Sequence, residues 1–294
     1  MKHIFIVNRI SGKGSAYGLI DTIIDIANQR KLEYEIRITE YVSHASKIAK
    51  EYQGRNDVII YSVGGDGTLL EVINGLDFNI PLGIIPAGSG NDFYRMIGGV
   101  PSDYRKIIND AIDGEIRMID LGKSNRGYFL NGTSFGIDAD INAEASHMIR
   151  KTFIAKGPAY VLSIIKNAIF LHRRKIIIDA DGNKKKGTYY IVAVMNGQYY
   201  GNGVKASPSS QIDDGYLNLI LFKNAPRYKA YPAMFRYLAG KAENDPIIER
   251  IKCQHLTIDS EEELSCQSDG ENYTAFHLEI DVVPKALKLK YPKK

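Results

Sequence analysis

The chain has 294 residues, of which 44% are hydrophobic and 24% are charged, and this composition argues against a disordered or fibrous protein. Its net charge of +4 suits phosphate ligands or an anionic membrane surface, and we expect no nucleic acid partner. The sequence contains no run of about 18 apolar residues that could cross a membrane, and no signal peptide is apparent. Cys253 and Cys266 form no metal-binding pattern. We therefore expect a cytoplasmic globular protein with reduced thiols, long enough for two domains.

Strand and helix patterns alternate through residues 1–120, which we interpret as an α/β domain. A parallel sheet with helices on its faces produces this alternation, and its ligands bind beyond the carboxyl ends of the strands. In chain order, the expected strands are His3–Val7, Tyr34–Thr39, Asp57–Val63 and Pro81–Pro86, and the helices between them include Tyr17–Gln29 and His44–Tyr52.

The most informative stretch is the turn Gly64–Thr68, which lies between the strand at 57–63 and an amphipathic helix. Its glycines allow a tight turn and a close approach to a ligand, and the amide groups that begin the helix favour phosphate. Asp66 in the middle is unusual for a pure anion site. A Mg²⁺ ion or a substrate hydroxyl between this carboxylate and the phosphates would explain it. The turn therefore predicts a nucleotide-using phosphotransferase.

Two more glycine-containing turns follow strands. Asn8–Gly14 lacks the first glycine of a Walker A loop, so a connecting turn and a phosphate-binding loop both fit. Pro86–Asp92 offers the hydroxyl of Ser89 and the pair Asn91 and Asp92, although Asp92 could simply cap the next helix. The joint occurrence of three such turns at strand ends predicts a nucleotide site.

Residues 121–283 are interpreted as a mostly antiparallel β-sandwich or distorted barrel. Asp181–Asn183 is a hairpin-turn signal, and we place Lys184–Lys186 in the same exposed loop. The pattern changes near residue 116, after which the expected strands are Arg117–Leu121, Gly127–Asn131, Lys175–Ala180, Gly187–Asn196, Gly215–Phe222, Ile251–Ser260 and Thr274–Val283.

The turn Gly64–Thr68, followed by Asn74-Gly75, resembles the nucleotide loop of the diacylglycerol kinase catalytic-domain family. That family includes sphingosine and ceramide kinases and soluble bacterial lipid kinases. Pro86–Phe93 is similar to its P-x-G-T/S-x-N-D element. NAD kinases share the glycine–aspartate turn, but the later Asp-Asp-Gly and Asp-Gly-Glu elements favour the lipid branch. The resemblance covers nearly the whole chain, and its later elements in order are Asn196-Gly197, Tyr200–Gly203, Asp213–Leu217, Asp269–Glu271 and Val283–Leu287.

The resemblance implies a set of site residues. Glu271 matches the proposed general base and Asp66 the essential aspartate of the glycine turn. A structural Mg²⁺ would be held by Asp214 with main-chain carbonyls of Gln211 and Tyr216. Arg9 departs from the family's usual proline. The residues implied to contact ATP are Asn8, Arg9, Ile10, Ser11, Gly12, Thr39, Gly64, Gly65, Asp66, Gly67, Thr68, Leu69, Leu70, Ser89, Asn91 and Asp92.

These elements predict an ATP- and Mg²⁺-dependent kinase that phosphorylates a lipid hydroxyl, with diacylglycerol as the leading acceptor. Residues 1–120 would bind the nucleotide, and Glu271 would reach the hydroxyl in the cleft between the domains. The resemblance also implies that the tail 284–294 packs back on residues 1–120. A helix at Pro158–His172 with basic flanks could line an acyl pocket and touch an anionic membrane surface, or pack in the core.

The sequence also allows other interpretations of function and of two of its turns. An NAD kinase-like soluble phosphotransferase and a catalytically silent nucleotide-binding regulator are the alternatives. Read alone, Asp213–Gly215 is also consistent with a hairpin turn, and Asp269–Glu271 with a surface turn. An exposed strand edge could support a homodimer.

Overall fold

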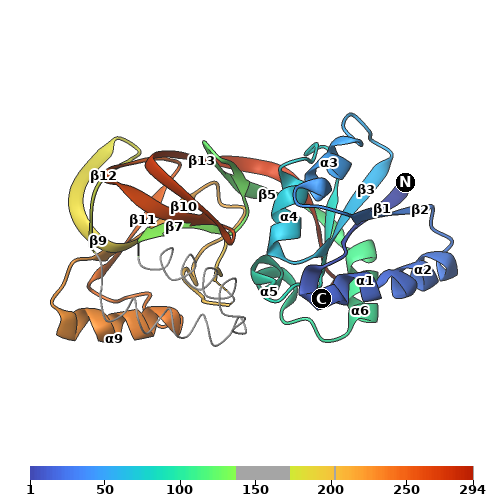
Figure 1. Cartoon of the computed structure of the whole chain (residues 1–294), viewed down its shortest axis with the longest axis horizontal. Coiled ribbons are helices and arrows are strands. Elements are labelled where there is room, and N and C mark those ends of the chain that lie inside the picture. The colour runs from blue at the N-terminus through green and yellow to red at the C-terminus, as the bar shows by residue number, and fades with distance from the viewer. Residues whose placement is uncertain (137–172, 202, 294) are drawn as a thin grey trace. The chain divides into compact units, whose positions relative to one another are not determined.

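The computed structural model describes residues 1–136, 173–201 and 203–293 (Figure 1). These residues form two compact units, and the expected helix at Pro158–His172 lies outside the described residues. None of the described helices is long and apolar enough to cross a membrane. The first unit comprises Met1–Leu121, Ile212–Asp214 and Val283–Lys294, and the second comprises Gly122–Gln211 and Gly215–Val282.

The first unit contains a sheet with the strand order β4-β3-β1-β2, in which all three neighbouring pairs are parallel. The end of β13 joins it beside β4, where Leu289 pairs with Leu82. The segment that begins at Val283 therefore belongs to the first unit although it follows the second in the chain. The four strands are β1 (Lys2–Asn8), β2 (Tyr34–Thr39), β3 (Val58–Gly64) and β4 (Leu82–Pro86).

Helices pack on this sheet because its central strands are apolar on both faces. Phe5 and Val7 point into a core with α1, α2 and α6, whereas the alternating Ile4 and Ile6 are equally buried on the other side. Helix α3 contacts β1, helix α4 contacts β3, and the two helices also pack against each other. The helical elements are η1 (Ser11–Gly14), α1 (Ser15–Gly18), α2 (Ile20–Gln29), α3 (His44–Lys50), α4 (Asp66–Ile73), α5 (Asp92–Gly98) and α6 (Tyr104–Asp113).

The second unit contains an antiparallel sheet with the order β11-β10-β9-β7-β12-β13, and β8 pairs with both β9 and β12. Alternating side chains fill two cores: Val192 and Val194 of β9 point into one, and Ile191 and Ala193 into the other. The strands of this part are β5 (Glu115–Ser124, which begins in the first unit), β6 (Gly127–Phe129), β7 (Gly132–Gly136), β8 (Arg174–Ala180), β9 (Asn183–Met195), β10 (Leu217–Lys223), β11 (Ile248–Cys253), β12 (His255–Ser268) and β13 (Glu271–Tyr291, which ends in the first unit).

Several details of the sequence interpretation were wrong. The helix expected at Tyr17–Gln29 is two helices, because α1 ends at Gly18 and α2 begins at Ile20. The strand expected at Ile251–Ser260 is interrupted at Gln254, between β11 and β12.

The third error concerns the three lysines Lys184–Lys186, which belong to β9 and not to a loop, since they pair with Ile177–Asp179 of β8. Asp181 and Gly182 both have positive φ, and such a two-residue turn lets the strand resume at Asn183.

The fourth error is an omission: α9 (Arg227–Leu238) was not expected at all. It packs Ala230, Ala233, Met234 and Tyr237 into one core of the second unit.

Candidate functional site

The carboxyl ends of the four parallel strands are level with one another. In the pairing register, Asn8 of β1 lies beside Thr39 of β2, Val7 beside Val63 of β3, and Gly64 of β3 beside Pro86 of β4. The turns that follow β1, β3 and β4 therefore leave the sheet at one edge. These are the three glycine-containing turns expected to hold a nucleotide.

The turn after β1 approaches the turn after β4 through Gly12. A Cβ added to Gly12 would lie 2.2 Å from the carbonyl oxygen of Ala87, and its φ of +58° also favours glycine. The hydroxyl of Ser11 donates to the same carbonyl at 3.4 Å. The first and third turns are thus in backbone contact.

The turn after β3 meets the turn after β4 at two glycines. A Cβ added to Gly88 would lie 2.3 Å from the Cα of Gly65, a separation that real Cβ atoms essentially never show. The amide of Ala87 also donates to the carbonyl of Gly64 at 2.7 Å. A side chain at Gly88 would therefore force the second and third turns apart.

Asn8 ties the first turn to the second. Its Nδ2 donates to Oγ1 of Thr68 at 2.8 Å, and its Oδ1 accepts from the amide of Ile10 at 3.1 Å. Thr68 is buried in the first turn of α4. One amide side chain therefore fixes both its own turn and the beginning of α4.

Asp66 is the first residue of α4, and its carboxylate faces the beginning of α5. Its Oδ1 accepts from the amide of Phe93 at 3.4 Å. Burial raises the pKa of the Asp66 carboxyl, and hydrogen bonds from the amides of Asp92, Phe93 and Asn91 oppose that rise. Asp66 therefore links the second turn to the helix that follows the third.

Asn91 shapes the third turn. It has a φ of +52°, its Oδ1 accepts from the amide of Gly88 at 2.9 Å, and its Nδ2 donates to the carbonyl of Gly88 at 3.0 Å. Asn91 occupies the N-cap position of α5, while Asp92 is a buried residue of the first turn. Asp92 is therefore not the cap. Ser89 is exposed at the tip of the turn.

The remaining residues expected to contact the nucleotide differ in their exposure and in the contacts that they already make. Leu69 and Leu70 are buried, and the amide of Leu69 already donates to the carbonyl of Gly65 at 3.1 Å. Thr39 is buried at the end of β2, whereas Ile10 is 79% exposed. Exposed Arg9 lies over the ring of Tyr17, with 5.8 Å between its Cζ and the ring centroid.

Gly67 differs from Gly12, Gly64, Gly65 and Gly88, whose added Cβ atoms would each lie 3.0 Å or less from another atom. It is exposed, and a Cβ added to it would meet no atom within 4 Å. Packing within the described residues therefore does not require a glycine at this position, unlike at Gly12 and Gly88. Close approach of a ligand to the first turn of α4 would require one.

In the second unit, Asp269 and Gly270 form the turn between β12 and β13. Ser268 pairs with Glu271 across it, and both turn residues have positive φ. Interpreting this segment as a turn is therefore correct for Asp269 and Gly270. Glu271 is the exposed first residue of β13.

Asp269 also anchors a neighbouring loop, a role that the sequence analysis missed. Its carboxylate accepts from the amides of Leu130, Asn131 and Gly132 at 2.6, 2.9 and 3.0 Å. Nδ2 of Asn196 donates to the carbonyl of Leu130 at 2.8 Å. The Asn-Gly and Asp-Gly-Glu elements, 73 residues apart in the sequence when counted from Asn196 to Asp269, thus hold the same loop.

The residues expected to hold a metal have oxygen donors of the kind that Mg²⁺ prefers, one carboxylate and two carbonyls. Asp214 belongs to the first unit, and Gln211 and Tyr216 belong to the second. The segment Asp213–Gly215 is not a hairpin turn, since β10 follows it but no strand of the described chain directly precedes it.

Another group of ligand-type side chains lies on the surface of the second unit. Among the described residues, potential ligand atoms of His255, Glu279 and Asp281 lie within 4.8 Å of one another. Nδ1 of His255 is 2.7 Å from Asp281, and this hydrogen bond raises the pKa of the histidine. An ion pair between β12 and β13 accounts for the arrangement.

Comparison with known proteins places these features in context. Residues 2–124 match the family described as the diacylglycerol kinase catalytic domain, and residues 131–291 match the YegS C-terminal NAD kinase beta sandwich-like domain. The chain is 29% identical over 269 residues to a diacylglycerol kinase of Bacillus subtilis (strain 168), covering 90% of this chain and 88% of that protein.

Two further relatives agree with this assignment. A probable lipid kinase, YegS-like, of Shewanella frigidimarina (strain NCIMB 400) is 27% identical, with 78% of this chain and 75% of that protein covered. A crystal structure of a provisionally named diacylglycerol kinase from Bacillus anthracis str. Sterne is 27% identical and has a TM-score of 0.80, with 99% of this chain and 97% of that chain covered. The chain therefore belongs to the lipid kinase family that joins a diacylglycerol kinase catalytic domain to a YegS-type C-terminal β-sandwich domain.

Proposed function

We propose that this lipid kinase transfers the γ-phosphate of ATP to the hydroxyl of diacylglycerol, in a Mg²⁺-dependent reaction that yields phosphatidic acid. The single observation that carries the nucleotide part is the backbone contact among the three glycine turns at one edge of the parallel strands. The diacylglycerol part is supported by the names of relatives such as the Bacillus subtilis protein. We assign nucleotide binding to residues 1–120 with the tail 284–294, and lipid binding to residues 121–283.

The ATP phosphates are proposed to lie against the first turn of α4. Amides at the start of a helix and its positive dipole end favour phosphate. The open space beside Gly67 supports this placement, because only a glycine leaves the backbone there accessible. Ser89, exposed at the tip of the third turn, is proposed to donate its hydroxyl to the same phosphates.

Glu271 is proposed as the general base of the transfer. Its carboxylate would take the proton of the lipid hydroxyl as that oxygen bonds to the γ-phosphorus, and the bond between the γ-phosphorus and the bridging oxygen would break to release ADP. A bound Mg²⁺ would neutralise negative charge on the phosphates. Asp214, with the carbonyls of Gln211 and Tyr216, is proposed to hold such an ion.

Asp66 is proposed to be essential because of its position between two turns. Its carboxylate contacts the amide that begins α5, so its loss would release the third turn from α4. Asp269 is proposed to act indirectly, by positioning Glu271. By clamping the loop Leu130–Gly132 it fixes the hairpin turn from which Glu271 begins.

One assay separates this proposal from its two alternatives. The purified chain is incubated with γ-labelled ATP and, in turn, diacylglycerol, ceramide and NAD, with Mg²⁺ and with EDTA. Label in phosphatidic acid that requires Mg²⁺ is the expected result. Label only in NAD would assign an NAD kinase-like activity. ATP binding with no transfer to any acceptor would assign a silent nucleotide-binding regulator.

A further inference from the structure

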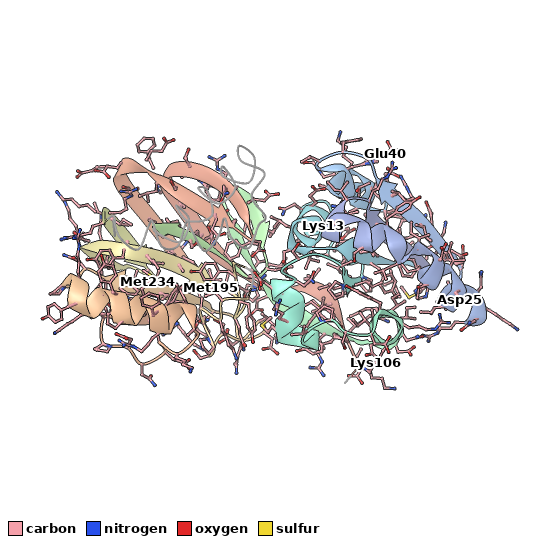
Figure 2. All side chains as sticks on the ribbon, turned by 60° about the horizontal axis from the view of Figure 1, so that its bottom comes forward. Lys13, Asp25, Glu40, Lys106, Met195 and Met234 are labelled. Atoms are coloured by element: carbon pink, nitrogen blue, oxygen red, sulfur yellow. The ribbon has the colours of Figure 1, made fainter. Side chains whose placement is uncertain are left out.

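The helix α9 of the second unit is strongly two-sided. Ala230, Ala233, Met234 and Tyr237 recur at helical spacing and are all buried. They share a core with Met195 of β9 and with residues of β10. Figure 2 labels two members of this core, Met234 of α9 and Met195 of β9. This face attaches the helix firmly to the sheet of the second unit.

The opposite face of α9 carries large apolar side chains in solvent. Tyr228 is 73% exposed and Phe235 is 65% exposed, and exposed Pro232 lies between them. Spacings of four and three residues place these side chains in one stripe along the helix. Because the buried face already anchors α9, the sheet does not need the aromatic stripe for its own packing.

Basic side chains flank the stripe, and the segment 227–241 contains no acidic residue. Arg227 and Lys229 are exposed, and Lys229 lies near the ring of Tyr228, with Nζ 5.9 Å from the centroid. Arg236 donates to the buried carboxylate of Asp245. The two cationic side chains of Arg227 and Lys229 therefore remain directed to solvent beside the aromatic stripe.

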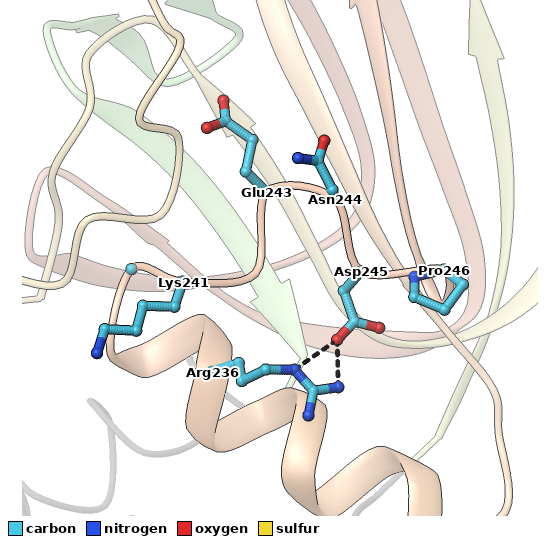
Figure 3. Close-up of a pocket in the computed structure, with 7 residues that line it drawn as sticks. Arg236, Lys241, Glu243, Asn244, Asp245 and Pro246 are labelled. Carbon is cyan, nitrogen blue, oxygen red and sulfur yellow. Dashed lines mark hydrogen bonds and ion pairs between the residues drawn. The ribbon is translucent and has the colours of Figure 1, made fainter.

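A pocket of about 510 Å³ at the end of α9 does not compete with this surface as a binding site (Figure 3). Its lining includes the pair Arg236 and Asp245, together with Lys241 and Glu243. Its two cationic and two acidic side chains balance, so it has no net charge with which to hold an ionic ligand. The surplus of positive charge lies on the outer face of the helix.

We propose that the outer face of α9 docks the protein on an anionic phospholipid bilayer. Tyr228 and Phe235 would enter the headgroup region, where aromatic side chains are favoured, and Arg227 and Lys229 would contact lipid phosphates. This inference rests on the proposed function, since it names the surface that brings the enzyme to an acceptor held in a bilayer. Charge complementarity selects a bilayer over a second copy of this chain, because two basic α9 faces would repel each other.

The test uses the full-length chain and sedimentation with two kinds of vesicle. One kind contains equimolar phosphatidylglycerol and phosphatidylcholine, and the other contains phosphatidylcholine alone. The wild type is expected to sediment with the anionic vesicles and not with the neutral ones. The Tyr228→Ser, Phe235→Ser double variant is expected to bind the anionic vesicles about tenfold more weakly or worse.

Matched controls separate α9 from the rest of the surface. Phe276→Ser removes an aromatic side chain that is 55% exposed on β13, and it should leave binding unchanged. Arg227→Gln with Lys229→Gln should weaken binding, whereas Lys184→Gln with Lys186→Gln, at an exposed part of β9, should not. Circular dichroism melts establish that every variant is folded. Unchanged binding by the folded α9 variants would overturn the proposal.

Two further measurements distinguish a failure of this inference from a failure of the proposed function. The α9 double variant should phosphorylate a water-soluble short-chain diacylglycerol at the wild-type rate but act poorly on long-chain diacylglycerol in anionic vesicles. A wild type that binds vesicles but transfers phosphate to no lipid would refute the proposed function alone. A wild-type dimer that the double variant abolishes, without vesicle binding by either, would overturn the docking proposal in favour of a protein partner.

Discussion

Nδ2 of Asn8 donates a hydrogen bond of 2.8 Å to Oγ1 of Thr68, so the turn after the first strand is fastened to the helix that follows the third. We expect Asn8→Ala to raise the KM for ATP about fivefold, because loss of one hydrogen bond costs about 1 kcal/mol. Steady-state kinetics at varied ATP concentration measure this change. Asn28→Ala, on the exposed side of α2, is the matched control, and equal effects of both changes would contradict the role of Asn8.

Two glycines of the site should respond differently to alanine. Gly88→Ala should destabilise the first unit by about 1–3 kcal/mol, because the new Cβ would lie 2.3 Å from the Cα of Gly65. Gly67→Ala should not destabilise the fold, since its Cβ meets no atom within 4 Å, but it should weaken ATP binding. Urea unfolding and calorimetric ATP titration measure the two effects. A Gly67→Ala protein with wild-type ATP affinity would remove the phosphates from the first turn of α4.

Asp269→Asn should loosen the loop Leu130–Gly132. The carboxylate accepts from three amides, and hydrogen bonds to a charged group are stronger than those to a neutral one. We therefore expect the free energy of unfolding to fall by about 2–4 kcal/mol. Because Asp269 also forms the turn before Glu271, kcat should fall more than KM for ATP rises. Hydrogen exchange of the loop amides, compared with the exposed control Asp213→Asn, tests the structural part. Unaltered exchange in Asp269→Asn would show that the carboxylate does not hold the loop.

The buried imidazole of His3 should make stability fall in mild acid. Burial, followed by repulsion from Lys290, the N-terminus and Arg30, lowers the pKa of His3 to about 4, and its Nδ1 lies 2.9 Å from the hydroxyl of Tyr61. The unfolded chain takes up a proton near its ordinary pKa of about 6.5, whereas the folded chain does not until about pH 4. This contribution is therefore fully present above about pH 6.5 and is lost as the pH falls toward 4.

Between pH 7 and pH 5 we expect the contribution of His3 to the free energy of unfolding to fall by about 2 kcal/mol. Urea unfolding at both pH values measures it, with His3→Gln as the comparison because glutamine does not titrate in this range. A wild type and a His3→Gln variant with the same pH dependence would show that His3 is not responsible.

The nucleotide edge could be anticipated from sequence because its signals are local. The glycines at 64–65 and 88 stand directly after apolar strands, and strand ends in the observed register bring such turns together. Which glycine touches which turn could not be anticipated. The approach of Gly65 to Gly88 and of Gly12 to Ala87 depends on how the strands are ordered in space, and no local pattern encodes that order.

The missed elements have identifiable causes. Pro232 stands inside α9, and a proline in a helical pattern normally indicates an end, so the segment lost its helical signal. Lys184–Lys186 directly follow the turn signal Asp181–Asn183, which suggests one continuous loop, but an Asp-Gly turn of two residues returns the chain to a strand at once. The anchoring role of Asp269 depends on contacts with residues 130–132, which are distant in the sequence.

We expect this chain to phosphorylate a lipid alcohol with Glu271 as the base. The most direct measurement is the initial rate of labelled phosphate transfer from ATP to diacylglycerol by the wild type and by Glu271→Gln, with ATP affinity determined for both. We predict transfer by the wild type, a loss of about a hundredfold or more in Glu271→Gln, and unchanged ATP affinity. Equal transfer rates for the two proteins would exclude Glu271 as the base, and no transfer by the wild type would exclude the proposed lipid kinase reaction.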